Sequence, residues 1–109
     1  MNRGDIVVVA APGAYGKPRP AVIIQTDALT ELGSKSIILC LLSGWEFPSP
    51  LFRIPLEPSD SNGLEKSSQL MVEKILTVPR EKISQVIGRL GDEQLVQLNR
   101  TLAFVVGLG

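Results

Sequence analysis

The sequence predicts a mainly β fold with one C-terminal helix, and three observations support this class. Hydrophobic residues make up 44% of the 109 residues but only 5% are aromatic, so the apolar positions are mostly Val, Ile and Leu. Such residues suit strands and close packing. Short apolar runs alternate with segments rich in Gly, Pro and Ser, as in small β domains. A single helical pattern follows near the C-terminus.

The strands can be placed in order along the chain. Residues 6–10, Ile-Val-Val-Val-Ala, lack polar alternation, which is typical of a strand covered on both faces. Residues 52–56 alternate instead, and Pro55 favours the edge of a sheet. Residues 83–90 fit either a strand or a helix. Further strands are expected at residues 21–25, 36–42 and 69–77, and loops at residues 11–20, 44–50 and 57–68.

The final segment has the spacing of an amphipathic helix. Its apolar positions are Leu95, Leu98, Leu102, Val105 and Val106. Asp92 and Glu93 favour a helix N-terminus, and Gly107 supplies a stop. Together with the strands, this helix predicts one small barrel-like domain spanning residues 1–109, since a second domain would leave neither half enough interior.

Charge and composition limit the chemistry. Eleven Lys and Arg balance eleven Asp and Glu, so any contact with nucleic acid must depend on local charge. The chain contains no histidine, which removes the commonest general base and the commonest zinc ligand. No metal or other cofactor is therefore expected. Cys40 is the only cysteine and lies within an apolar run, so we expect a buried thiol. The apolar run after residue 5 is too short for a signal peptide or membrane span, which makes a cytoplasmic location the default.

Three stretches resemble the MazF/PemK toxin family. They are residues 3–7 (Arg-Gly-Asp-Ile-Val), residues 17–25 (Lys-Pro-Arg-Pro-Ala-Val-Ile-Ile-Gln) and residues 74–90, which include Thr-Val-Pro and Ile-Gly-Arg-Leu. With the closing helix they cover most of the chain in the family's order. The resemblance implies an SH3-like small barrel of the MazF/PemK/CcdB type that forms a homodimer. It also implies the toxin of a toxin-antitoxin pair, which cleaves single-stranded RNA such as mRNA at short motifs and binds an antitoxin protein.

Arg19 matches the catalytic arginine of that family. Its neighbours Pro18 and Pro20 restrict the backbone, so the side chain leaves the loop with reduced freedom. Metal-free RNA cleavage needs a base for the 2'-hydroxyl, a donor for the charged phosphorane and a proton for the leaving oxygen. A guanidinium suits the second role because its forked donors match phosphate oxygens. The plain alternative is a solvated loop cation.

Ser43 and Glu73 complete the predicted catalytic set. The resemblance places a threonine or serine that holds the scissile phosphate at Ser43, although a serine before glycine is also an ordinary turn residue. Glu73 retains the carboxylate of an acid-glutamine pair found in relatives and is the candidate base; otherwise it is a strand carboxylate paired with a lysine. Two positions depart from the family: Met71 replaces an arginine of some relatives, and Ser67 an aspartate of many.

Five further residues are candidates for binding RNA. Lys17 and Lys74 would attract phosphates, or would simply be solvated. Trp45 and Phe47 follow Ser43 and would stack on unpaired bases, although Phe47 has packing as an equal alternative. Tyr15 in the first loop is a weaker stacking candidate.

Two other functions are compatible with the same fold. A DNA gyrase poison of the CcdB type would act through the C-terminal residues, and the apolar, glycine-containing end of this chain fits that pattern. A small-barrel binding module without catalysis would fit the zero net charge and the family residues that are missing. The Pro-Arg-Pro loop favours the nuclease over the gyrase poison.

Overall fold

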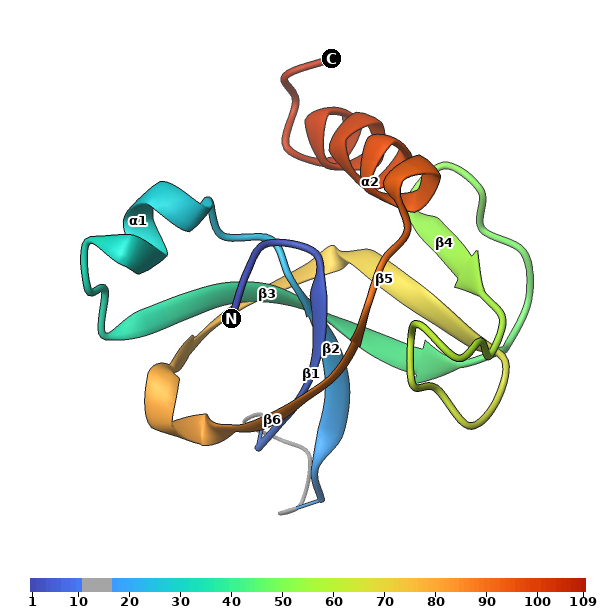
Figure 1. Cartoon of the computed structure of the whole chain (residues 1–109). Coiled ribbons are helices and arrows are strands. Elements are labelled where there is room, and N and C mark those ends of the chain that lie inside the picture. The colour runs from blue at the N-terminus through green and yellow to red at the C-terminus, as the bar shows by residue number, and fades with distance from the viewer. Residues whose placement is uncertain (11–16) are drawn as a thin grey trace.

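The computed structural model describes residues 1–10 and 17–109, and its strands form one six-stranded antiparallel sheet (Figure 1). The strands are β1 (Asp5–Val9), β2 (Arg19–Ile23), β3 (Ser36–Gly44), β4 (Arg53–Leu56), β5 (Ser68–Pro79) and β6 (Ile83–Arg89). The helices are α1 (Asp27–Glu31), the 3₁₀ turn η1 (Arg80–Lys82) and α2 (Asp92–Val105). The order β4-β5-β3-β2-β1-β6 leaves β4 and β6 as edges. The predicted class is confirmed, with an open sheet in the described part of the chain.

β5 bends sharply where it crosses β3. Cys40 faces Ile75, but Leu42 faces Leu70, so the single residue Leu41 of β3 lies opposite residues 71–74 of β5. Extra residues on one strand bend it and increase its twist. The first part of β5 therefore pairs with β4, whereas its last part leads through η1 to β6. Glu73 lies in the bent stretch.

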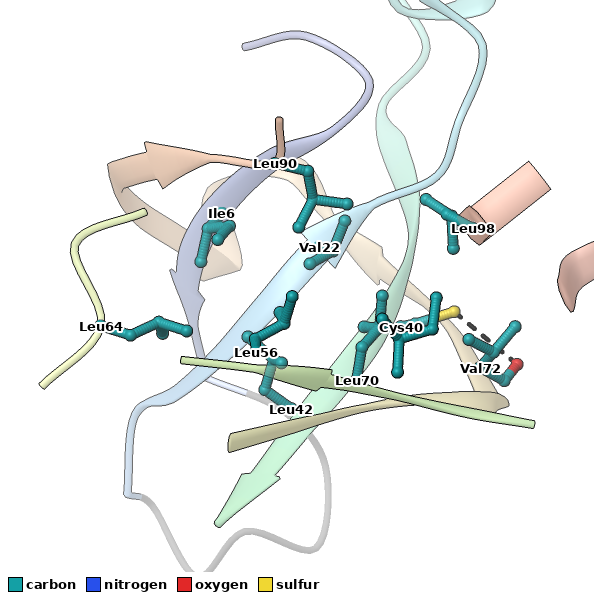
Figure 2. Close-up of a cluster of buried hydrophobic side chains, with 11 residues drawn as sticks. Ile6, Val22, Cys40, Leu42, Leu56, Leu64, Leu70, Val72, Leu90 and Leu98 are labelled. Carbon is teal, nitrogen blue, oxygen red and sulfur yellow. Dashed lines mark hydrogen bonds between the residues drawn. The ribbon is translucent and has the colours of Figure 1, made fainter. Parts of the chain in front are cut away.

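Two apolar clusters occupy opposite faces of the central strands. The larger cluster contains Val22, Cys40 and Leu42, and α2 covers it through Leu98 (Figure 2). The smaller cluster contains Ala21, Ile23 and Leu39, packed with Val78 of β5. Burying one leucine such as Leu98 contributes about 1.5–3 kcal/mol. Because both faces are covered, the central strands are continuous apolar runs rather than alternating ones.

Several boundaries differ from the sequence-based expectation. The first loop was expected to extend to Pro20, but β2 already begins at Arg19, and Pro20 pairs with Val8. Proline is tolerated near a strand's start because the missing N–H matters little there. Residues 83–90 resolve as the edge strand β6. The helix α1 follows β2 without a strong periodic signal in its five residues.

Other expectations are confirmed. Pro55 is exposed on the edge strand β4, and Cys40 is fully buried, with its thiol 3.8 Å from the carbonyl oxygen of Val72 (Figure 2). The helix α2 begins after Gly91, whose N–H donates to the side chain of Gln94. Its end is followed by Gly107 at φ 82°, a conformation that favours glycine. None of the helices in the described residues is long and apolar enough to cross a membrane.

Candidate functional site

Arg19 and Ser43 lie beside each other on neighbouring strands. β2 pairs with β3 through Ala21 and Leu41, and the same register continued by two residues brings Arg19 opposite Ser43. Arg19 donates from Nη2 to the carbonyl oxygen of Leu42 at 3.1 Å. The hydroxyl of Ser43 donates to the carbonyl oxygen of Gly44 at 3.0 Å. Two of the three predicted catalytic residues therefore occupy one end of the β2–β3 pair.

A cavity of about 430 Å³ opens next to Arg19. Its walls come from three parts of the chain that are distant in sequence: the Pro18–Pro20 stretch, residues 63–66 and β6. Lys66 lines the same cavity. Its Nζ is close to Gly44, at 3.8 Å from the position that a Cβ on this glycine would occupy. Two cations therefore border one concave surface, which suits an anionic ligand. Lys66 belongs to no recognisable motif, so only its proximity to Gly44 identifies it.

Glu73 is bound by an arginine rather than a lysine. Arg53 of β4 donates to Oε2 of Glu73 from Nε at 3.1 Å and from Nη2 at 2.9 Å. Both side chains are largely buried, with 14% and 27% exposed. The other carboxylate oxygen, Oε1, is buried without a hydrogen-bond partner in the described residues. No hydrogen bond there joins Glu73 to Arg19 or Ser43, so the candidate base is not in direct contact with the other two residues.

The predicted RNA-binding residues are dispersed over the surface. Trp45 and Phe47 are 47% and 63% exposed in the turn that follows β3. Lys17 and Lys74 are exposed, the first before β2 and the second in the bent part of β5. Tyr15 lies outside the described residues. The two aromatic residues are therefore near Ser43 in sequence and available to solvent.

A second, smaller hollow of about 90 Å³ lies under this turn. Trp45, Arg53, Pro55 and Gln69 line it together with residues 48–50. Gln69 is only 1% exposed and donates from Nε2 to the carbonyl oxygen of Phe47 at 2.7 Å. Its Oε1 is buried and accepts no hydrogen bond within the described residues. Gln69 thus places an unpaired acceptor beside Ser43, its direct partner across the β3–β5 pair.

Burial changes the pKa of the Cys40 thiol. Burial in the larger apolar cluster raises the pKa of the Cys40 thiol from 9.0 to about 12, and the negative charge of Glu73 adds to the effect. The thiol therefore stays protonated at neutral pH and is a poor nucleophile. Within the described residues, no three carboxylates or thiols gather closely enough to hold a metal ion.

Comparison with known proteins identifies the family. The sequence profile of the PemK-like, MazF-like toxins of type II toxin-antitoxin systems matches residues 2–106. The chain belongs to this family. It is 40% identical over 109 residues to a probable endoribonuclease MazF of Mycolicibacterium smegmatis, covering 99% of this chain and 98% of the relative. It is 25% identical to the endoribonuclease MazF of Staphylococcus saprophyticus over 113 residues, covering 99% and 92%.

Solved structures share the fold. A mycobacterial endoribonuclease in complex with its cognate antitoxin superposes with a TM-score of 0.82 at 18% identity, over 100% of this chain and 97% of that one. The Mycobacterium tuberculosis toxin MazF-mt6 gives 0.81 at 17% identity, over 96% and 98%. A MazE–MazF structure from Deinococcus radiodurans gives 0.79 at 16% identity, over 100% and 98%. The fold of this MazF-like toxin is therefore that of these solved structures.

The two positions where the resemblance implies a departure from the family both lie next to charged side chains. The hydroxyl of Ser67 donates to Oε2 of Glu57 at 2.6 Å. Met71 is buried and pairs across the strands with Arg53 of β4.

Proposed function

We propose that this chain is a sequence-specific endoribonuclease toxin that cuts single-stranded RNA, including mRNA, without a metal ion. RNA cleavage is the activity named for both MazF relatives, and one of them is 40% identical over nearly the whole chain. The observation that carries the proposal is the hydrogen bond from Arg19 to the carbonyl oxygen of Leu42, next to Ser43, at the border of a 430 Å³ cavity. Such a concave site with a positioned guanidinium suits a phosphodiester.

The proposed reaction is attack by the RNA's own 2'-hydroxyl. The 2'-oxygen loses its proton and bonds to phosphorus, the bond from phosphorus to the 5'-oxygen breaks, and that oxygen takes up a proton. The products are a 2',3'-cyclic phosphate and a free 5'-hydroxyl. Arg19 stabilises the negative charge that grows on the phosphorane, and the Ser43 hydroxyl holds a phosphate oxygen. Lys66 adds positive charge on the same cavity.

Glu73 is the proposed base. Its Oε2 is engaged by Arg53 and its Oε1 is enclosed, so proton transfer requires the Arg53–Glu73 pair to separate when RNA binds. A base must come within hydrogen-bond reach of the proton that it removes. Lys17, Lys74, Trp45, Phe47 and Tyr15 are proposed to hold the RNA on either side of the cut.

The proposed partners are a cognate antitoxin protein and a second copy of this chain, acting in the cytoplasm. Structures of similar fold include toxins solved with their antitoxins. Exposed apolar residues such as Val86, Phe104 and Leu108 leave surface for such contacts. A small chain also gains stability when a second copy covers apolar surface.

The test is to map cut ends on a long RNA in EDTA. We expect the wild-type protein to leave cyclic phosphate ends at a short recurrent motif, and Arg19→Ala to leave the RNA largely intact. Arg100→Ala, on the exposed face of α2, is the matched control and should cut like wild type. Intact RNA with wild-type protein, or equal cutting by Arg19→Ala, would contradict the proposal.

The two alternative functions are not favoured. The matching family profile is that of the MazF-like toxins, and the relatives found are named as endoribonucleases rather than gyrase poisons. A gyrase supercoiling assay would detect the first alternative. Expression of the chain alone without growth arrest would support a binding module.

A further inference from the structure

We propose that Gln69 reads the edge of the RNA base next to the cleaved phosphate, through the hollow under the Trp45 turn. This inference rests on the proposed nuclease function and adds the residue that selects a base. It starts from a row of cross-strand partners: Ser43 of β3 faces Gln69 of β5, and Gln69 faces Pro55 of β4. Direct partners in an antiparallel sheet have side chains on the same face, about 4.5–5.5 Å apart at Cβ. Gln69 therefore lies next to the residue proposed to hold the scissile phosphate.

The amide of Gln69 is oriented by the backbone. Nε2 donates to the carbonyl oxygen of Phe47, and the flipped amide would bring two oxygens together, so Oε1 must be the free end. That oxygen is buried without a donor in the described residues. A buried acceptor without a hydrogen bond is unfavourable. A ligand that supplies an N–H to it therefore gains more binding free energy here than on an open surface.

The walls of the hollow suit a flat ring. Residues 48, 50 and 55 are prolines, and the half-exposed Trp45 lies at the margin. Arg53 lines the same hollow, and its Nη1 is 3.9 Å from Glu46, too far for a hydrogen bond. The site thus offers one unpaired acceptor, one available donor and an aromatic face. Bases bind single-strand readers through this combination of stacking and edge contacts.

The size of the hollow allows only the edge of a base to enter. Its volume of about 90 Å³ is below the roughly 150 Å³ of an engineered cavity that holds benzene, so no whole ring fits. The rest of the base then stacks on Trp45. The Watson–Crick edge of every base presents an N–H beside an acceptor, as in the amine and ring nitrogen of cytosine or the N3–H and carbonyl of uracil, and this pattern matches Gln69 and Arg53.

Entry of the base requires the turn to move outward, because Gln69 Oε1 is enclosed in this structure. Two hydrogen bonds attach the turn to the segment from Ser67 to Gln69: Trp45 N–H donates to Ser67, and Gln69 Nε2 donates to Phe47. The N–H groups of Phe52 and Arg53 both donate to Ser49. The chain contains a single tryptophan, so its fluorescence reports on this turn alone.

The first test maps cut sites on a long RNA with wild type, Gln69→Leu and Gln97→Leu. Gln97 is exposed on α2 and serves as the matched control. We expect wild type and Gln97→Leu to prefer the same base at the position adjacent to the cut, and Gln69→Leu to lose that preference. A wild type that accepts any base at that position, or an unchanged motif with Gln69→Leu, would overturn the inference.

The second test changes the RNA and so does not depend on the folding of a variant. In an oligonucleotide carrying the wild-type motif, the base next to the cut is replaced by an analogue that lacks the N–H in question. The analogue is pyrimidin-2-one for cytosine, 3-methyluracil for uracil, unsubstituted purine for adenine or 1-methylguanine for guanine. We expect cleavage by wild type to slow roughly tenfold, the usual effect of losing one hydrogen bond to a buried acceptor. Tryptophan fluorescence of Arg19→Ala should change with the parent oligonucleotide and much less with the analogue. Equal rates for parent and analogue would reject the role of Gln69, whereas no cleavage of any RNA would reject the nuclease function instead.

Discussion

Arg19 donates a hydrogen bond of 3.1 Å to the carbonyl oxygen of Leu42, one residue before Ser43. This bond runs between two strands and holds the guanidinium at the cavity wall. A donor that is already positioned loses little freedom when the charged phosphorane forms. The bond from Arg19 to Leu42, next to Ser43, is the basis of the predictions for Arg19 and Ser43.

Replacing Arg19 should reduce cleavage far more than stability. We expect Arg19→Ala to lower kcat by about 100- to 1,000-fold, as when one donor to a developing oxyanion is removed. Arg19→Lys should fall between, because an ammonium keeps the charge but not the fork. Single-turnover cleavage of a defined oligonucleotide in EDTA gives the rates, and urea unfolding should show a loss of only about 1 kcal/mol. A large loss of stability would instead assign Arg19 a structural role.

The hydroxyl of Ser43 should be replaceable by another hydroxyl. We expect Ser43→Thr to cut at nearly the wild-type rate and Ser43→Ala to be slower by roughly tenfold, the effect of one hydrogen bond. The measurement is kcat/KM on the same oligonucleotide. Ser84, whose hydroxyl donates to the Val8 backbone at the opposite edge, provides the control Ser84→Ala. If Ser43→Ala and Ser84→Ala have the same rate, the Ser43 hydroxyl does not contact the phosphate.

A double-mutant cycle separates two roles of Glu73. Glu73→Gln and Arg53→Met each break a largely buried charged pair, and we expect each to cost about 3–5 kcal/mol because one charge is left buried and unpaired. The double variant should recover part of that loss. If Glu73 is the base, Glu73→Gln also lowers the cleavage rate at least 100-fold, whereas Arg53→Met, which removes a proposed contact to the RNA base, lowers it much less. Equal rates for the two single variants would limit Glu73 to a structural role.

Gly63 and Gly88 of β6 lie where two backbone segments come so close that neither position should tolerate a side chain. Gly63 has φ 66°, and a Cβ there would overlap the carbonyl oxygen of Ile87, while a Cβ on Gly88 would overlap the backbone of Asn62. We expect Gly88→Ala to destabilise the protein by about 3 kcal/mol or more through overpacking and backbone shifts. Gly91→Ala is the control, since its nearest neighbour lies 3.7 Å away. Urea midpoints measure both, and similar midpoints would show that the loop can yield.

The buried thiol should make stability depend on alkaline pH. Burial raises the pKa of Cys40 to about 12, while the unfolded thiol ionises near 9.0. Between these values the unfolded chain binds fewer protons than the folded one, so stability falls as pH rises, by about 1.4 kcal/mol per pH unit. Below pH 9 this contribution does not vary. Unfolding in urea at pH 8 and pH 10 should show a drop for wild type that is absent in Cys40→Ala. Parallel pH curves for the two proteins would contradict the assigned pKa.

The sequence by itself determined the class of the fold and the most prominent site residue. The run at residues 6–10 and the leucine spacing of α2 depend on local periodicity, which one segment shows without its neighbours. The Pro-Arg-Pro stretch indicated a restrained cation because proline fixes its own backbone wherever it occurs. It did not indicate that Arg19 begins a strand, since strand pairing depends on the partner.

Only the tertiary structure decided which residues meet. The bend that leaves Leu41 opposite residues 71–74 turns Glu73 toward Arg53, and the register of β3 with β5 brings Gln69 beside Ser43. Lys66 follows Arg19 by 47 residues in the sequence. It reaches the cavity next to Arg19 because its loop folds back against Gly44. These contacts join segments distant in sequence, and they follow from register and packing, which local residue patterns do not specify.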